Sequence, residues 1–179
     1  MANMSNDDSA TLATVIAKDA IRELALLYSR GVDRKDIALL RRLYTRDGID
    51  NHGDLYSGSA EAFCDYLAES LPHVRYSGHH ICNHLIDVDG DRATGEIYAI
   101  ACHVLPDGNG GWAEDIMWVR YCDNYRIEDG AWRFARRDVS FDYRSLRPIE
   151  LADPAIPEPA ADLSYAVLSS PLFARRQAG

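Results

Sequence analysis

Two aspartate–glycine pairs divide the second half of the chain into long segments rich in strand-forming residues. Asp89-Gly90 and Asp129-Gly130 each separate two such segments, in which valine, isoleucine and tyrosine are frequent. Asp-Gly is typical of a tight β-hairpin turn, and such a turn joins antiparallel neighbours. We therefore predict an antiparallel sheet of four long strands: Arg75–Asp89, Arg92–Leu105, Trp112–Glu128 and Ala131–Tyr143.

The first half of the chain has the patterns of helices. From about Thr11 to Gly31, apolar residues recur at helical spacing. Asp36 and Ser59 are good N-caps for two further helices, Ile37–Tyr44 and Ala60–Leu71, separated by a short extended piece, Ile49–Tyr56. Helices followed by a strand meander predict an α+β fold, with the helices on one face of the sheet.

We expect three regions along the chain. Residues 1–10 are predicted to be a disordered leader, and residues 11–145 the α+β domain. Residues 146–179 are rich in proline and alanine, and we expect them to form an arm that packs on a neighbouring subunit.

The net charge of −9 argues against nucleic acid or an anionic membrane surface as a partner, because both require a cationic face. No apolar run approaches the ~20 residues of a membrane span. The first residues lack the basic start and apolar centre of a signal peptide, so we expect a cytoplasmic protein.

Three of the six histidines lie close together, at His79, His80 and His84. Strict strand alternation places His79 with Ile81, Asn83 and Leu85, and places His80 and His84 on the far face. His80 and His84 would then lie ~13 Å apart, too far to share a metal ion. The four cysteines form no close pair, and no glycine-rich phosphate loop is present. We therefore predict no metal and no cofactor, and one histidine on a pocket wall.

The segment Arg92–Leu105 predicts a pocket. One face of this strand is built mostly of small residues, with His103 as its single histidine, and small side chains under helices leave volume. The opposite face, which includes Tyr98 and Ile100, is also apolar. A sheet that is apolar on both sides needs two covers, so we expect a second subunit to supply one of them.

Several motifs together resemble the SnoaL-like group of the nuclear-transport-factor-2-like superfamily. They are Gly31-Val32-Asp33 at the end of the first helix, His79-His80-Ile81-Cys82-Asn83, the hairpin Ile86–Ala93, and Gly130–Phe134. The resemblance covers roughly residues 12–145 and is greatest to the lyase branch, which includes scytalone dehydratase, bile-acid 7α-dehydratase and hexachlorocyclohexane dehydrochlorinase. It implies a cystatin-like, cone-shaped roll of three N-terminal helices on a curved antiparallel sheet.

The resemblance also implies a site. Asp33 and His79 match an Asp–His dyad, Tyr28 matches a pocket tyrosine, and His103 falls near a second active-site histidine. Arg137 matches an inward arginine. Val32 replaces a tyrosine of scytalone dehydratase, so the substrate does not carry over. Lyases of this group are mostly trimers and use no metal, so we expect a homo-oligomer, with a trimer favoured over a dimer. The residues expected to line the substrate pocket are Asn83, Tyr56, Ala99, Ala101 and Trp118.

This dyad suits elimination of water β to a carbonyl, because a histidine held by a carboxylate can take the α-proton and later return a proton to the leaving oxygen. We therefore predict a cofactor-independent lyase, a dehydratase acting on a hydrophobic cyclic substrate. A polyketide-cyclase-type isomerase with the same base is one alternative. The other is a non-catalytic ligand-binding subunit, like the small subunit of aromatic-ring dioxygenases. In that case Asp33 would cap the second helix, His79, His103 and Tyr28 would be core residues, and Arg137 would pair with Asp138 or Asp142 at the surface.

Overall fold

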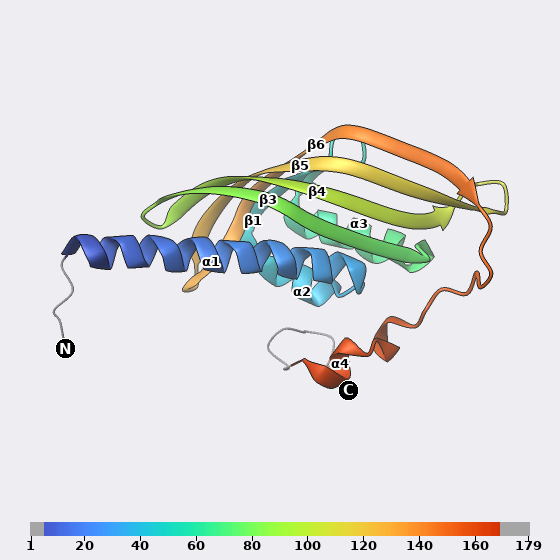
Figure 1. Cartoon of the computed structure of the whole chain (residues 1–179), viewed down its shortest axis with the longest axis horizontal. Helices are drawn as coiled ribbons and strands as arrows, with labels where there is room; N and C mark the ends of the chain where they lie inside the picture. Colours follow the sequence, from blue (N-terminus) through green and yellow to red (C-terminus); the bar gives the residue numbers. More distant parts are fainter. Residues whose placement is uncertain (1–5, 169–179) are drawn as a thin grey trace.

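Three helices lie against one face of a curved, six-stranded sheet in the computed structural model, which describes residues 6–168 (Figure 1). The α+β prediction is confirmed. The elements are α1 (Asn6–Asp33), α2 (Ile37–Leu43), β1 (Tyr44–Asn51), β2 (Ser57–Ser59), α3 (Ala60–Ser70), the short 3-10 helix η1 (Leu71–His73), β3 (Tyr76–Asp89), β4 (Arg92–Pro106), β5 (Trp112–Glu128), β6 (Ala131–Ile149), η2 (Pro159–Ala161) and α4 (Ser164–Val167).

The strand order is β2-β1-β6-β5-β4-β3, and β3 to β6 form the predicted antiparallel meander. The prediction of a wholly antiparallel sheet is wrong at one place, because β1 pairs with β6 in parallel, with Asp50 opposite Arg137. The helical pattern had placed Tyr44 in the second helix, and this hid the start of β1. In the structure α2 ends at Leu43 and the chain continues directly into β1.

Both predicted helix caps are present. The Leu39 backbone N–H donates to Asp36 Oδ1 (3.0 Å), and the Ala62 backbone N–H donates to Ser59 Oγ (3.3 Å). Each bond satisfies a donor that has no partner inside its helix. At the other end of the domain, α1 begins at Asn6, so residues 6–10 of the predicted leader are helical. Residues 1–5 lie outside the described range.

A β-bulge in β3 changes the orientation of the histidine segment. Ile81 pairs with Ala99 and His84 pairs with Ile97, so two residues, Cys82 and Asn83, stand opposite one. An extra residue reverses the alternation beyond it. His84 therefore points to the same face as His79, and Asn83 is exposed. The predictions that Asn83 shares the face of His79 and that His84 lies on the far face are both wrong.

The sheet has an inner face, which faces α1, and an outer face. Ala25 of α1 packs in a buried cluster with residues of β4 and β5 that define the inner face: Ile97, Ala99, Ala101, Met117, Val119 and Tyr121. Trp118 projects from the outer face, where its side chain is 39% exposed and its ring lies 5.0 Å from that of Tyr143. The prediction that Trp118 lines the pocket is therefore wrong.

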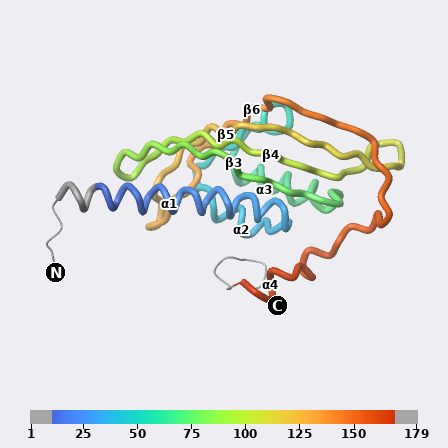
Figure 2. Tube along the Cα trace, in the orientation of Figure 1, coloured from blue at the N-terminus to red at the C-terminus, as the bar shows by residue number. Residues whose placement is uncertain are grey.

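The C-terminal arm returns to the helices. β6 runs to Ile149, beyond the predicted end at Tyr143, and the chain then crosses to the side of the helices away from the sheet (Figures 1 and 2). There Arg34 pairs with Asp162 (2.8 Å), and Arg30 donates to Ser164 Oγ (2.9 Å). The arm thus contacts α1 of its own chain, and its packing on a neighbouring subunit stays a prediction. None of the helices within residues 6–168 is long and apolar enough to cross a membrane.

Candidate active site

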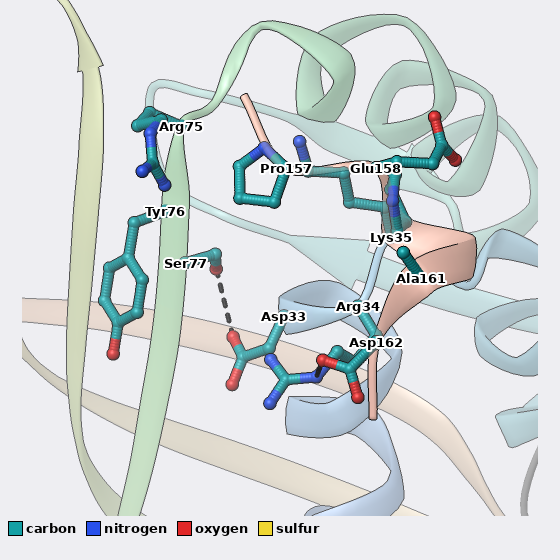
Figure 3. A pocket seen from close by; sticks show the side chains of 11 residues that line it. Asp33, Arg34, Lys35, Arg75, Tyr76, Ser77, Pro157, Glu158, Ala161 and Asp162 are labelled. Atoms are coloured by element: carbon teal, nitrogen blue, oxygen red, sulfur yellow. Dashed lines mark hydrogen bonds and ion pairs between the residues drawn. The ribbon is translucent and has the colours of Figure 1, made fainter. Parts of the chain in front are cut away.

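The predicted dyad forms where the end of α1 meets β3. Asp33 is the last residue of α1, and His79 Nδ1 lies 2.6 Å from Asp33 Oδ1. The same carboxylate accepts the backbone N–H of His79 (3.0 Å) and the hydroxyl of Ser77 (3.0 Å), a bond drawn in Figure 3. Only 7% of the His79 side chain and 14% of the Asp33 side chain are exposed. Three donors from β3 therefore fix this carboxylate.

The carboxylate is ionised at neutral pH. Burial by itself raises the pKa of Asp33, but the hydrogen bonds and charge of His79 lower it, and the net pKa lies below its ordinary value. An ionised carboxylate is an acceptor only, so His79 Nδ1 carries the proton of this bond. Nε2 of the neutral ring then keeps its lone pair and can act as a base.

His103 lies beside the dyad, as predicted. It stands opposite Ser77 in the β3–β4 pairing, and its ring centroid is 5.3 Å from that of His79 in an edge-to-face arrangement. Burial first, and then the neighbouring His79, lower the pKa of His103 to about 4. A neutral His103 can donate an N–H bond to an oxygen of a substrate. Ala101 and Ala99 stand opposite His79 and Ile81 and are buried, and their lining of a substrate pocket stays a prediction.

Arg137 forms a second buried cluster with Tyr28. Its Nε and Nη2 donate to the two carboxylate oxygens of Asp123 (2.8 and 2.7 Å), and both side chains are 0% exposed. Its Cζ lies 4.2 Å from the ring centroids of Tyr28, Tyr121 and Phe134. This is a cation–π arrangement with three rings. Arg137 is therefore an inward arginine, and the alternative of a surface pair with Asp138 or Asp142 is wrong.

Tyr121 connects the two clusters. Its pKa is raised by burial and, among other charges, by Asp33, while its ring lies 6.1 Å from that of Tyr28. The pKa of Tyr28 is also raised, first by burial and then by the charge of Asp50. Tyr28 thus keeps its hydroxyl proton, and its side chain is buried beside Arg137 (2% exposed).

The structure does not bring three of the predicted pocket residues to the dyad. Asn83 is exposed at the bulge, and Trp118 projects from the outer face. Tyr56 lies in the β1–β2 connection, where its hydroxyl donates to the Ser59 carbonyl (2.7 Å) and its ring packs 5.2 Å from that of Phe63. These three residues do not form a common pocket wall.

Sequence reasoning missed three polar residues of the inner face, Ser77, Asp115 and Asp123. A signal was present in β5, because alternation places Asp115 and Asp123 on the same face as Met117, Val119 and Tyr121. Acidic residues on an otherwise apolar strand face need partners if they are buried. Here the partners are arginines of β6.

A cleft of about 240 Å³ reaches the dyad from the Asp33 side (Figure 3). It lies between the end of α1, the start of β3 and the C-terminal arm. Neither Ala99 nor Ala101 lines this cleft, so it is not the pocket expected above those residues. The lining residues are Asp33, Arg34, Lys35, Arg75, Tyr76, Ser77, Pro157, Glu158, Pro159, Ala161 and Asp162.

These features define an α+β domain in which helices and a curved sheet enclose a buried aspartate–histidine pair. The chain belongs to the SnoaL-like domain family, because the model of that family matches residues 13–138. A comparison with curated proteins gave no match.

Solved structures share the fold. A candidate scytalone dehydratase from Novosphingobium aromaticivorans has a TM-score of 0.69 at 22% identity, over 80% of this chain and 96% of its own. A type 2 hexachlorocyclohexane dehydrochlorinase (LinA) has a TM-score of 0.69 at 21% identity, over 82% and 99%. A nuclear-transport-factor-2-like protein with a cystatin-like fold, also from N. aromaticivorans, has a TM-score of 0.59 at 18% identity, over 79% and 92%. At these identities the likeness shows the fold alone.

Proposed function

We propose that this protein is a cofactor-independent lyase of the dehydratase type that acts on a hydrophobic cyclic substrate. The observation that carries the proposal is the 2.6 Å contact between His79 Nδ1 and Asp33, in which two further donors of β3 fix the same carboxylate. Two similar structures bear the names of enzymes that eliminate water or hydrogen chloride, which supports an elimination reaction.

In the proposed reaction, His79 Nε2 removes the proton on the carbon next to a carbonyl group. The electron pair of the broken C–H bond moves to the carbonyl oxygen and forms an enolate. The enolate then re-forms the carbonyl and a C=C bond as the β C–O bond breaks, and the departing oxygen takes the proton from the His79 imidazolium. Water leaves, and the histidine returns to its neutral form.

The surrounding residues stabilise the charges of this sequence. Asp33 faces the imidazolium that forms at His79, while neutral His103 and Tyr28 can donate to the developing oxygen anions. A positioned base of this kind contributes a factor of roughly 10²–10⁴ in rate.

The non-catalytic alternative expected Asp33 to cap the second helix. Asp36 makes that cap, and Asp33 bonds to β3 instead. Asp33 therefore does not have the capping role that the non-catalytic alternative gave it. Its buried carboxylate is held against an imidazole instead, which favours the catalytic proposal.

The test is a screen of β-hydroxy-ketones of the decalin and steroid type, with enone formation followed by ultraviolet absorbance. We expect wild type to convert at least one compound, and His79→Gln and Asp33→Asn to lower kcat/KM by roughly 10²–10⁴-fold. His80→Gln is the matched control, because His80 is the exposed neighbour on the outer face. Conversion that persists in His79→Gln would contradict the proposal, and so would the absence of conversion by wild type across the panel.

We also propose that the outer face is covered by another copy of the chain, in a homotrimer. Its apolar part includes Tyr98, Trp118 and Tyr143, all substantially exposed in the single chain. Light scattering coupled to size-exclusion chromatography should give three chain masses for wild type and a smaller species for Trp118→Glu. A monomer for wild type would refute this proposal.

A further inference from the structure

Arg144 lies on the same inner face of the sheet as the dyad, but on β6, three strands away from β3. His79 pairs with Ala101, Ala101 with Met117, and Met117 with Arg144, across β3, β4, β5 and β6. Directly paired residues of antiparallel strands point to the same face. Arg144 and His79 therefore belong to one row, three strand spacings or about 14 Å apart at the backbone.

Asp115 holds the Arg144 guanidinium in a fixed orientation. Arg144 Nε and Nη2 donate to the two oxygens of Asp115 at 2.8 and 2.6 Å. The Asp115 side chain is 4% exposed, whereas that of Arg144 is 54% exposed. Asp115 is also directly opposite His103 in the β4–β5 pairing. A buried carboxylate beside the site thus orients an arginine that is half open to solvent.

The donors of Arg144 are only partly used. A guanidinium has five N–H donors, and the fork to one carboxylate occupies Nε and Nη2. Among the partners described within residues 6–168, Asp115 is the sole carboxylate bonded to Arg144. The Arg137–Asp123 pair has the same fork, but both of its side chains are 0% exposed, whereas Arg144 is half open to solvent. Arg144 retains the Nη1 edge for a second anion.

We propose that Arg144 binds a carboxylate of the substrate on which the Asp33–His79 dyad acts. This inference rests on the proposed function. The substrate class is then a hydrophobic cyclic acid, whose carboxylate lies about the length of a fused two-ring body from the carbon that loses its proton. Between the two ends lie Ala101 and Met117, which are 3% and 8% exposed, so the ring body enters only if Met117 moves, and its unbranched thioether can adapt to the shape of its neighbours.

The same strand offers a matched control. Arg147 is paired with Glu114, also between β6 and β5, although its Nε and Nη2 both contact the same oxygen, Oε2 (2.7 and 2.6 Å). Glu114 pairs with Val104 and Arg147, whereas Asp115 pairs with His103, so this second pair lies on the outer face. Arg147→Gln therefore removes an equivalent charge from the strand without touching the inner face.

The experiment measures dissociation constants for 2-naphthylacetate and its neutral analogue 2-naphthylacetamide by isothermal titration calorimetry. We expect wild type and Arg147→Gln to bind the acid at least about 10-fold more tightly than the amide, since a hydrogen bond to a charged group is worth that ratio or more. Arg144→Gln should remove this preference and leave the affinity for the amide unchanged. Added salt should weaken binding of the acid alone.

A second variant guards against a folding defect, because Arg144→Gln leaves the Asp115 carboxylate without its partner. Asp115→Asn/Arg144→Gln removes both charges and should also bind acid and amide equally. Equal affinities in wild type, a preference that survives Arg144→Gln, an equal loss in Arg147→Gln, or no binding of the acid at millimolar concentration would each overturn the inference.

The outcome also separates this inference from the proposed function. His79→Gln should lower the rate of elimination by roughly 10²–10⁴-fold yet keep the preference for the acid. A wild type that prefers the acid but eliminates nothing would refute the lyase and retain the anion site. A wild type that eliminates water but binds the acid and the amide equally would retain the lyase and refute the anion site.

Discussion

Replacement of Asp123 by asparagine should destabilise this domain strongly, because it leaves a fully buried guanidinium without its counter-charge. Both side chains of the Arg137–Asp123 pair are 0% exposed, and Asp123 accepts two bonds from Arg137 and a third from the Tyr125 hydroxyl (2.9 Å). Breaking such a pair costs about 3–5 kcal/mol. For a domain of this size that corresponds to a fall of roughly 6–20 °C in Tm.

Urea denaturation followed by far-ultraviolet circular dichroism measures the loss. The matched control is Asp65→Asn, which breaks the exposed pair with Arg41 and should cost no more than about 1 kcal/mol. The double variant Asp123→Asn/Arg137→Met removes both charges and should recover most of the loss, because the three rings around Arg137 then pack against an apolar side chain. An Asp123→Asn protein within about 1 kcal/mol of wild type would refute this account of the buried cluster.

Three further predictions follow from particular residues. The pKa of His103 falls from 6.5 to about 4 on folding, so the unfolded state binds more protons between these values and stability decreases as the pH falls. From pH 7 to pH 5 the share of His103 is about 2 kcal/mol, and His103→Gln should lose that part of the pH dependence in urea titrations; an unchanged slope would count against a buried neutral imidazole. Tyr28→Phe should keep the ring against Arg137 and the Tm of wild type while lowering kcat on a β-hydroxy-ketone by roughly 10-fold or more, and an unaltered kcat would remove Tyr28 from the site. Deletion of Asn83 removes the extra residue of the bulge and restores regular alternation with Ile86 and Val88 still inward, so its Tm should stay close to that of wild type; a large loss of Tm would contradict the bulge.

The elements that local sequence determines were predicted well. Asp89-Gly90 and Asp129-Gly130 place the two hairpins, and both glycines adopt positive φ (60° and 76°), which these turns require. The caps at Asp36 and Ser59 were likewise readable, since a cap depends on a hydrogen bond within a few residues. The predicted contact between Asp33 and His79 came from the resemblance, and the geometry confirms that these residues meet.

The predictions that are wrong concern features that depend on contacts between distant segments of the chain. The residues near Tyr44 give no local signal that the helix ends there and that a strand parallel to β6 begins. The residue that pairs with Tyr44 is Phe134, ninety residues later in the chain. The bulge at Cys82-Asn83 leaves no local mark, since either side of it reads as regular alternation. Burial of Ile86 and Val88 against the helices then selects the register, and this also turns His84 inward. The prediction for Asn83 is wrong for that reason, while the prediction for Trp118 is wrong because alternation with buried Met117 and Val119 places Trp118 on the outer face.

The central claim, that Asp33 and His79 form a general base, is tested most directly by proton exchange in the absence of elimination. In D₂O at neutral pH, nuclear magnetic resonance follows the loss of the α-proton signals of 2-tetralone, a hydrophobic cyclic ketone with no leaving group. We predict exchange above the buffer rate for wild type and His80→Gln, a rate roughly 10²–10⁴-fold lower for Asp33→Asn, and the buffer rate for His79→Gln. Exchange by His79→Gln at the wild-type rate would contradict the claim.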